Sequence, residues 1–260
     1  MMGAEAGEPR YAVVIPAYNE AATIADVAAR ALAQVERVIV VDDGSTDGTA
    51  AALANVPVTV LRNDRNLGKG GSLWRGMRHA LGLGAAGVVT LDGDGQHAPE
   101  EIGRLLAAAR AHPGEIIIGA RWFGREAAPR ARYVANRIAD FFIGWAAGQA
   151  LDDSQSGFRV YPATVLQRVE VHHGPARGFV FESEVLITAA RLGIPSRAVP
   201  IAALYPHGAR QSHFCPVLDI ARISRMILWK LVSRGLNPAG LYRVLAGRQA
   251  ERASAIDETA

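Results

Sequence analysis

Short runs rich in Val and Ile alternate with alanine-rich stretches along the first half of the chain, and this alternation limits the fold more than any other feature. The Val- and Ile-rich runs are continuously apolar, as strands buried on both faces are, and the stretches between them have helical length and spacing. Strands that alternate with helices form a mostly parallel sheet covered by helices. The sequence therefore predicts a doubly wound, Rossmann-like α/β fold with strands near 11–16, 37–42, 58–62, 87–92 and 115–120, and helices near 20–34, 47–55, 70–81 and 98–111.

The segments that follow the predicted strands are polar or rich in glycine. They read AYNE, DDGSTDGT, NDRNLGKGG, DGDGQH and ARWFGR in chain order. Ligands of open α/β sheets bind beyond the carboxyl ends of the strands, and in a parallel sheet these ends lie at one edge. The sequence therefore predicts a polar binding site at that edge.

Two aspartates one residue apart, Asp92 and Asp94, directly follow the fourth predicted strand. Mg²⁺ and Mn²⁺ prefer carboxylate oxygens and often keep coordination positions for substrate phosphates. A solvated Asp-Gly turn is the structural alternative. An EF-hand loop is excluded, because its glutamate position would hold Gly103 if the loop began at Asp92. The place of the pair at the sheet edge favours a metal site.

Asp42 and Asp43 end the second predicted strand, where a carboxylate can accept hydrogen bonds from a base or a ribose. Capping of the next helix by Ser45, Thr46 or Asp47 is the alternative, and it explains Asp47 better than Asp42.

The segment NLGKGGS leads into a helix whose first amides can meet an anion, and it contains Lys69, one of only two lysines in the chain. A surface cation at a helix start is the alternative. The segment lacks the Walker A spacing, and the GxGxxG match at 82–87 precedes a strand instead of following one. Neither a P-loop nor a dinucleotide fingerprint is therefore present.

The second half contains two longer helical patterns, at 130–151 and 217–234. On the latter we expect one apolar arc and one basic arc; the apolar arc holds Val217, Ile220, Ile227, Leu228 and Leu231, and the basic arc holds Arg222, Arg225, Lys230 and Arg234. Basic, apolar helices suit the surface of an anionic bilayer. Packing on the core or a dimer contact is the alternative, and a homo-oligomer is left open.

Composition places the chain among globular proteins, with 260 residues, 50% hydrophobic residues and a net charge of +3. The single Cys215 excludes an internal disulfide. Neither a secretory signal nor an apolar run of the roughly 20 residues that span a membrane is visible. We expect a cytoplasmic protein that lies peripherally on the membrane, with no nucleic-acid partner.

Seven stretches in order resemble the inverting family 2 glycosyltransferases of GT-A fold, close to the dolichyl- and polyprenyl-phosphate mannose and glucose synthases. They are VVIPAYNE, VVDDGSTDGT, NLGKGG, LDGDGQH, GAR, DSQSGFRVY and ESEVLITAARLG. The resemblance covers roughly residues 10–214. Together with the residue pattern of the rest of the chain, it leads us to expect a disordered start at 1–9, a GT-A domain at 10–214, amphipathic helices at 215–247 and a polar tail at 248–260.

The resemblance also implies roles for individual residues. The nucleotide sugar would be bound by Pro16, Ala17, Tyr18, Glu20, Asp42, Asp43, Lys69, Asp92 and Gly93. Mg²⁺ or Mn²⁺ would be held by Asp92, Asp94 and Gln96, with Gly93 in place of the family's usual alanine. The acceptor side would include Ser156, Arg159, Glu182 and Ser212, and the catalytic residues would be Asp94, Asp152, Arg121 and Arg210.

The expected reaction is inverting transfer of a sugar from a nucleotide-diphosphate sugar to a lipid acceptor, with polyprenyl phosphate favoured. Such a phosphate is already an anion, whereas a hydroxyl acceptor would need a general base, for which Asp152 is the first candidate and Glu182 the second. The hydroxyl alternative arises because RQSHFCPVLD resembles a segment of transferases that act on other lipids or aryl polyenes. A sugar nucleotidyltransferase is disfavoured, because PAYNEAAT replaces a glycine-rich basic loop after the first strand, and a non-catalytic nucleotide-sugar binder is left open.

Overall fold

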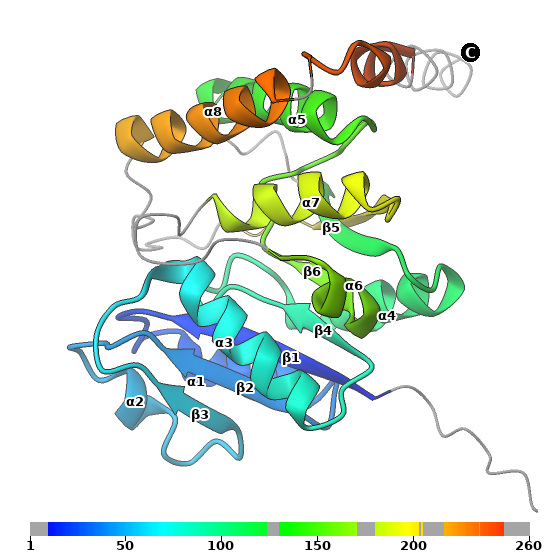
Figure 1. Ribbon diagram of the computed structural model, residues 1–260. Helices are drawn as coiled ribbons and strands as arrows, with labels where there is room; N and C mark the ends of the chain where they lie inside the picture. Colours follow the sequence, from blue (N-terminus) through cyan, green and yellow to red (C-terminus); the bar gives the residue numbers. More distant parts are fainter. Residues whose placement is uncertain are drawn as a thin grey trace, which may run out of the picture.

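A seven-stranded sheet in the order β3-β2-β1-β4-β6-β5-β7 forms the centre of the molecule (Figure 1). The computed structural model describes residues 10–123, 130–170, 180–202, 204, 216–233 and 235–246. All strand pairs are parallel except those of β6, which runs antiparallel to β4 and β5. The predicted doubly wound, mostly parallel fold is confirmed. The strands are β1 (Tyr11–Ala17), β2 (Val38–Asp42), β3 (Thr59–Arg62), β4 (Gly87–Thr90), β5 (Ile116–Phe123), β6 (Arg159–Pro162) and β7 (Ser196–Ala202).

Helices cover both faces of the sheet, as the continuous apolar character of the strands requires. One face packs against α1 (Ile24–Leu32), α2 (Thr49–Ala52), the 3-10 turn η1 (Pro99–Glu101) and α4 (Ile102–Ala111). The other face packs against α3 (Gly68–Gly82), α6 (Ala163–Arg168) and α7 (Phe181–Arg191).

Close packing of α3 on the sheet depends on a glycine. A Cβ on Gly76 would meet a methyl group of Val14 at 2.4 Å, so this helix reaches β1 only because the side chain is absent. The buried residues Leu73, Met77 and Ala80 lie on the same helical face. This approach brings the start of α3, with Lys69, to the carboxyl edge of the sheet.

A further layer, formed by α5 (Arg130–Ala147) and α8 (Pro216–Val232), lies beyond α7 (Figure 1). Buried apolar side chains of both helices join the core cluster that contains α7, and polar contacts add to this packing. The Lys230 ammonium lies 3.0 Å from a Glu184 carboxylate oxygen on α7, and the Arg191 guanidinium donates to the Lys230 carbonyl oxygen at 2.7 Å. The Trp145 indole on α5 donates to the carbonyl oxygen of Leu236, just before the helical residues 238–246.

The described side chains of the apolar arc predicted on the helix at 217–234 differ in burial. Ile227 and Leu231 are buried, together with Ile223 and Met226, whereas Leu228 is 61% exposed. Lys230, from the predicted basic arc, is mostly buried because its ammonium pairs with Glu184 of α7. The side chains of residues 217–220 and residue 234 lie outside the described residues.

Two local expectations are wrong. The strand β3 was expected to be buried on both faces, but it is the edge strand and Val60 is 41% exposed. The helix expected at 47–55 is limited to α2, Thr49–Ala52. Among the helices that the structure describes, none combines the length and the apolar character needed to cross a bilayer.

Candidate active site

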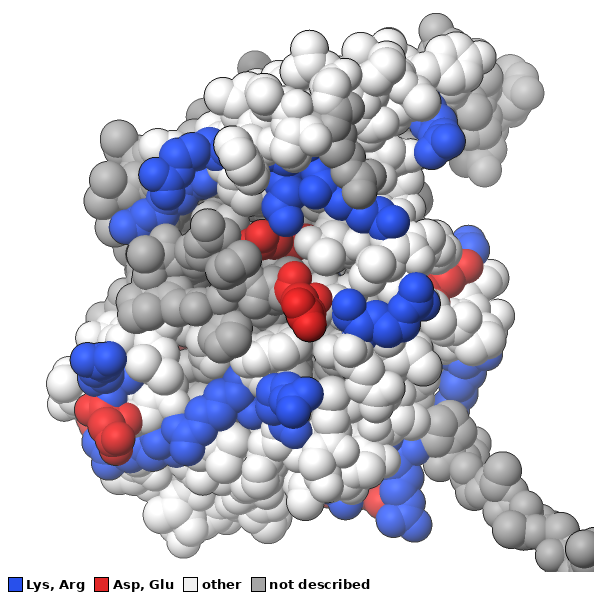
Figure 2. Space-filling view, in the orientation of Figure 1, with Lys and Arg blue, Asp and Glu red and all other residues white. Residues whose placement is uncertain are grey.

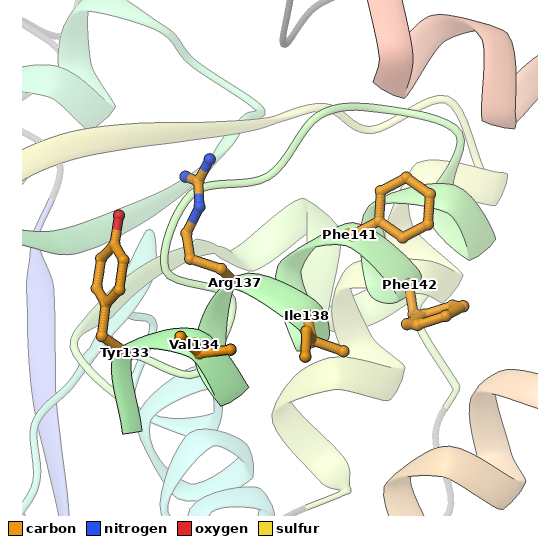
Figure 3. Close-up of a pocket in the computed structure, with 6 residues that line it drawn as sticks. All are labelled: Tyr133, Val134, Arg137, Ile138, Phe141 and Phe142. Atoms are coloured by element: carbon orange, nitrogen blue, oxygen red, sulfur yellow. The ribbon is translucent and has the colours of Figure 1, made fainter. Parts of the chain in front are cut away.

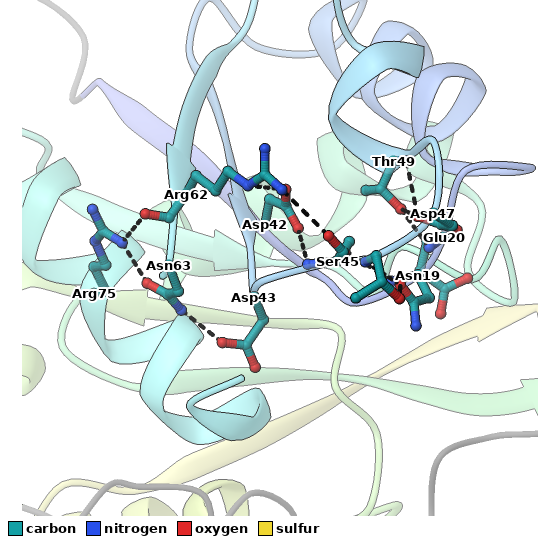
Figure 4. Close-up of polar contacts among 11 residues, drawn as sticks. Asn19, Glu20, Asp42, Asp43, Ser45, Asp47, Thr49, Arg62, Asn63 and Arg75 are labelled. Atoms are coloured by element: carbon teal, nitrogen blue, oxygen red, sulfur yellow. Dashed lines mark hydrogen bonds and ion pairs between the residues drawn. The ribbon is translucent and has the colours of Figure 1, made fainter. Parts of the chain in front are cut away.

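The loops after β1 and β2 interlock at the carboxyl edge of the sheet (Figure 4). The Asn19 backbone N–H donates to Ser45 Oγ at 2.9 Å, and the Thr46 backbone N–H donates to Asn19 Oδ1 at 2.8 Å. The Glu20 backbone N–H donates to Thr49 Oγ1 at 2.8 Å. These bonds give the two loops one fixed arrangement, which positions the predicted nucleotide-binding residues Tyr18 and Glu20 beside the end of β2. The N-cap of α2 is Gly48, and the preceding Asp47 accepts the Thr49 N–H through Oδ1 at 2.9 Å.

Asp42 has a buried carboxylate with one oxygen that accepts no hydrogen bond within the described residues. Its Oδ1 accepts the Ser45 backbone N–H at 2.9 Å, whereas Oδ2 lies 3.4 Å from Nε of Arg62 without hydrogen-bond geometry. A buried oxygen that accepts no hydrogen bond lowers the stability of the fold, so this atom is suited to accept one from a ligand that approaches beside Arg62. Pro16 and Ala17 lie next to it, because Ala17 pairs with Asp42 in the sheet register.

Asp43, by contrast, is engaged by the protein itself. Its Oδ1 accepts from Asn63 Nδ2 at 2.6 Å and from the Leu67 N–H at 2.8 Å, and Oδ2 accepts the Gly68 N–H at 2.8 Å. These bonds satisfy amides at the start of α3. The structure therefore gives Asp43 a part in positioning the segment that carries Lys69.

Lys69, Asp92 and Glu182 form a mostly buried cluster of charges. The Lys69 ammonium lies 2.7 Å from Asp92 Oδ1 and 3.0 Å from Glu182 Oε1. Burial alone would lower the pKa of Lys69, but the two carboxylates outweigh it and raise the pKa above its ordinary value. The same ammonium helps to lower the pKa of Asp92 although burial acts in the opposite direction. Lys69 is therefore charged, and its ammonium connects the turn after β4 to the start of α7 through these two ion pairs.

The turn after β4 presents oxygen ligands of the kind that hard divalent cations prefer. Asp94 is partly exposed, and its Oδ1 accepts the Gln96 backbone N–H at 3.0 Å. A Cβ on Gly93 would lie 3.4 Å from the Pro16 carbonyl oxygen, so the turn sits tightly against β1. Within the described residues, no group of three or more His, Cys, Asp or Glu side chains is arranged to hold a metal ion. The carboxylates of Asp92 and Asp94 nevertheless fit the expected metal by their chemistry.

His97 was not singled out from the sequence, yet it lies beside Asp92. Its Nδ1 is 3.9 Å from Asp92 Oδ2, and its ring packs against Phe158. Burial lowers the pKa of His97 to about 4, so the ring is neutral at physiological pH. The sequence signal that could have identified His97 is its position in DGDGQH, directly after the paired aspartates.

Arg121, at the end of β5, is held by Asp153 and not by the neighbouring Asp152. The guanidinium donates to both Asp153 carboxylate oxygens at 2.7 Å, and the Arg121 backbone N–H donates to Oδ2 at 2.9 Å. Although burial opposes ionisation, this arginine lowers the pKa of Asp153. Asp152 instead lies 3.6 Å from the guanidinium of Arg137 on α5. Sequence reasoning chose Asp152 from two adjacent aspartates, and only the fold distinguishes their roles.

Arg159 has no exposed surface, and it supports from beneath the loop that the sequence predicted on the acceptor side. Its guanidinium donates to the carbonyl oxygens of Ser154, Ser156 and Glu182 and to the Tyr161 hydroxyl. Ser156 is equally buried. Because β6 runs antiparallel, its first residue lies at the same edge as the carboxyl ends of the parallel strands. Arg159 thus fixes the loop's shape, and its side chain has no surface exposed to a ligand in this structure.

On the face shown in Figure 2, basic side chains lie over both the sheet region and the helical layer, with acidic side chains between them. The predicted Arg210 and Ser212 lie outside the described residues. The remaining predicted site residues all belong to the loops at one edge of the sheet or to the elements beside it.

A sheet of this order, with paired aspartates after β4 at its carboxyl edge, is the arrangement expected of the GT-A fold. The family model "Glycosyl transferase family 2" matches residues 12–171, more than half of the chain. The protein belongs to glycosyl transferase family 2 and is a glycosyltransferase.

Named relatives align with most of the chain. It is 32% identical over 204 residues to the polyprenol monophosphomannose synthase of Mycolicibacterium smegmatis, with 74% of this chain and 76% of that protein covered. It is 31% identical over 207 residues to the undecaprenyl-phosphate mannosyltransferase of Micrococcus luteus, with 74% and 82% covered.

A solved structure of glucosyl-3-phosphoglycerate synthase from Mycobacterium tuberculosis, in complex with Mn²⁺, uridine diphosphate and glucosyl-3-phosphoglycerate, superposes with a TM-score of 0.60. The identity is 24%, and 87% of this chain and 80% of that chain are covered. At this identity the likeness establishes the shared fold.

Proposed function

We propose that this protein transfers a sugar, with inversion, from a nucleotide-diphosphate sugar to the phosphate of a polyprenyl phosphate. The observation that carries the proposal is the convergence of three groups at one edge of the sheet. They are the buried Oδ2 of Asp42, which accepts no hydrogen bond within the described residues, the aspartates after β4, and Arg121 held by Asp153. These suit, in that order across the edge, a nucleoside, a metal-bound diphosphate and the negative charge of the reacting phosphates.

Mg²⁺ or Mn²⁺ would be held by Asp92, Asp94 and Gln96 together with oxygens of the donor diphosphate. When bound, such an ion supplies positive charge that stabilises the departing nucleoside diphosphate. The protein's own part is positional and electrostatic. Asp153 fixes the guanidinium of Arg121 in one orientation, and a fixed donor stabilises developing negative charge without reorganising during the reaction.

The acceptor is proposed from the relatives' names and from the surface of α5. Both relatives described above are named for the transfer of mannose to a polyprenyl-type phosphate. A groove of about 290 Å³ on α5 is lined by Tyr133, Val134, Arg137, Ile138, Phe141 and Phe142 (Figure 3). It is apolar except for Arg137 and the Tyr133 hydroxyl, and Arg137 reaches Asp152 of the acceptor-side loop. An apolar chain with an anionic head suits this surface, and no general base is then required of Asp152.

We propose that the layer of α5 and α8 rests on the membrane that contains the acceptor. Exposed apolar side chains lie on both helices, with Val134, Ile138 and Phe142 on α5 and Leu228, Trp229 and Val232 on α8. Arg225 is exposed on the same side of α8 as Leu228 and Trp229. Apolar side chains beside cations favour the surface of an anionic bilayer.

Incubation with nucleotide sugars, Mn²⁺ and either a short polyprenyl phosphate or the matching polyprenol tests the proposal. Mass spectrometry of the lipid should show a hexose added to the phosphate and not to the alcohol. Transfer to the alcohol alone would establish the hydroxyl alternative, and binding of the donor without transfer to either lipid would refute the proposal.

A further inference from the structure

The chain has only two lysines, and each pairs with a glutamate in the first turn of α7. Lys69 lies 3.0 Å from Glu182, and Lys230 lies 3.0 Å from Glu184. Within the described part of the chain, Lys69 has a second carboxylate partner, Asp92 at 2.7 Å, and Lys230 does not. A carboxylate expected to bind a divalent cation is thus already engaged by a cation of the protein.

A lysine ammonium and a metal ion compete for the oxygens of one carboxylate and repel each other. An ammonium at 2.7 Å occupies a lone-pair direction of Asp92 Oδ1, and like charges repel strongly where water is scarce. The side chains of Lys69 and Asp92 retain only 19% and 23% of their exposure, so solvent screens this repulsion poorly. Glu182 offers the ammonium a second partner that it keeps when Asp92 is taken.

We propose that Lys69 is a built-in competitor of the divalent cation for Asp92, and that Glu182 retains the ammonium when the cation binds. This inference rests on the metal assigned to Asp92 and Asp94 in the proposed function. Its consequence is an order of binding. The metal alone binds weakly, because it must displace Lys69, and a nucleoside diphosphate strengthens binding because its negative charge compensates both cations.

The crowding around this cluster supports the competition. A Cβ on Gly157 would lie 2.6 Å from Asp92 Oδ2 and 2.9 Å from Lys69 Nζ, and the Gly157 carbonyl oxygen is fixed by the Thr90 hydroxyl at 2.7 Å. The loop above the ion pair is therefore held against it. Little room is left in which Asp92 could bind both cations at once.

Two variants change metal affinity in opposite directions. In the double variant Lys69→Met with Glu182→Gln, one positive and one negative charge are removed, so the net charge of the cluster stays the same. Mn²⁺ should bind about tenfold more tightly, because Asp92 has lost its competitor. In Glu182→Gln alone, Lys69 keeps only Asp92, and Mn²⁺ should bind about tenfold more weakly.

Electron paramagnetic resonance of free Mn²⁺, titrated with the full chain in the presence and absence of uridine or guanosine diphosphate, measures these affinities without an acceptor. Lys230→Met is the matched control, since it breaks the equivalent pair with Glu184 on the same helix and should leave Mn²⁺ affinity unchanged. Circular dichroism and the Tm of each variant establish that it is folded.

Equal Mn²⁺ affinity in the wild type and the double variant would overturn the inference. So would an unchanged affinity in Glu182→Gln, which decides the matter if the double variant does not fold. In either case the proposed transfer reaction would stand. If the wild type binds no Mn²⁺ even with a nucleoside diphosphate, the metal of the proposed function fails, and this inference fails with it.

Discussion

Replacing Gly157 by alanine tests the active site with the smallest available perturbation. The added Cβ would lie 2.6 Å and 3.0 Å from the two carboxylate oxygens of Asp92 and 2.9 Å from Lys69 Nζ. Gly157 does not have a positive φ, so alanine adopts its backbone conformation without strain. The hydrogen bond from the Thr90 hydroxyl to the Gly157 carbonyl holds the loop in place. The side-chain ends of Asp92 and Lys69 must therefore move.

The size of this movement follows from the distances. Ordinary contact with a Cβ begins near 3.4 Å, so the nearest Asp92 oxygen must retreat from 2.6 Å, a shift of about 0.8 Å. A misplacement of about 1 Å in an active site costs about 100-fold in rate. We expect kcat/KM to fall about 10- to 100-fold. Only the ends of flexible side chains are displaced, so the free energy of unfolding should change by less than about 1 kcal/mol.

The assay combines the initial rate of hexose transfer with thermal unfolding of the same preparation. Gly103→Ala is the matched control, because a Cβ at that position in α4 meets nothing within 4 Å. The control should keep full activity and gain about 0.5 kcal/mol from better helix propensity. A Gly157→Ala enzyme with wild-type kcat/KM would refute the assignment of Asp92 and Lys69 to the active site.

Three further perturbations have defined outcomes. Asp94→Asn should lower kcat at least about 100-fold and weaken Mn²⁺ binding measured by magnetic resonance, and normal values for both would exclude Asp94 as a ligand. Burial raises the pKa of Asp140 to about 6, so its ionisation destabilises the fold as pH rises from about 4 to 6. Asp140→Asn should therefore add about 1–2 kcal/mol to the free energy of unfolding at pH 8 and little at pH 4, as measured by urea denaturation. The control is Asp64→Asn, at an exposed position. An equal gain at both pH values would contradict this prediction. Trp229→Glu should reduce co-flotation with anionic liposomes about tenfold, whereas Leu83→Glu, at an exposed apolar site on another element, should float like the wild type.

The strand–helix alternation predicted the sheet well, because strands buried on both faces must be continuously apolar. It missed β6, the four residues RVYP, because this strand begins with an arginine and ends with a proline. Nothing in that composition indicates a central strand. Arg159 is buried there because its hydrogen bonds are received by three carbonyl oxygens and a hydroxyl, one of which, the Glu182 carbonyl oxygen, comes from the start of α7.

The sequence predicted which loops form the site, but it did not predict which side chains pair with one another there. The paired aspartates after β4 were visible because their spacing follows directly from the end of a strand. The partner of Arg121 was not, since Asp152 and Asp153 are equivalent in sequence and only the positive φ of Asp153 turns its carboxylate toward β5. The contact between Lys69 and Asp92 depends on how closely α3 approaches the sheet, which no local pattern reveals.

Metal-dependent transfer at the edge of the sheet is tested most directly by the rate of hexose transfer to polyprenyl phosphate after the protein has been treated with a chelator. We predict that transfer stops when divalent cations are removed and returns when Mn²⁺ or Mg²⁺ is added in excess, with the hexose inverted at its anomeric carbon in the product. Undiminished transfer by the chelated protein would contradict the account.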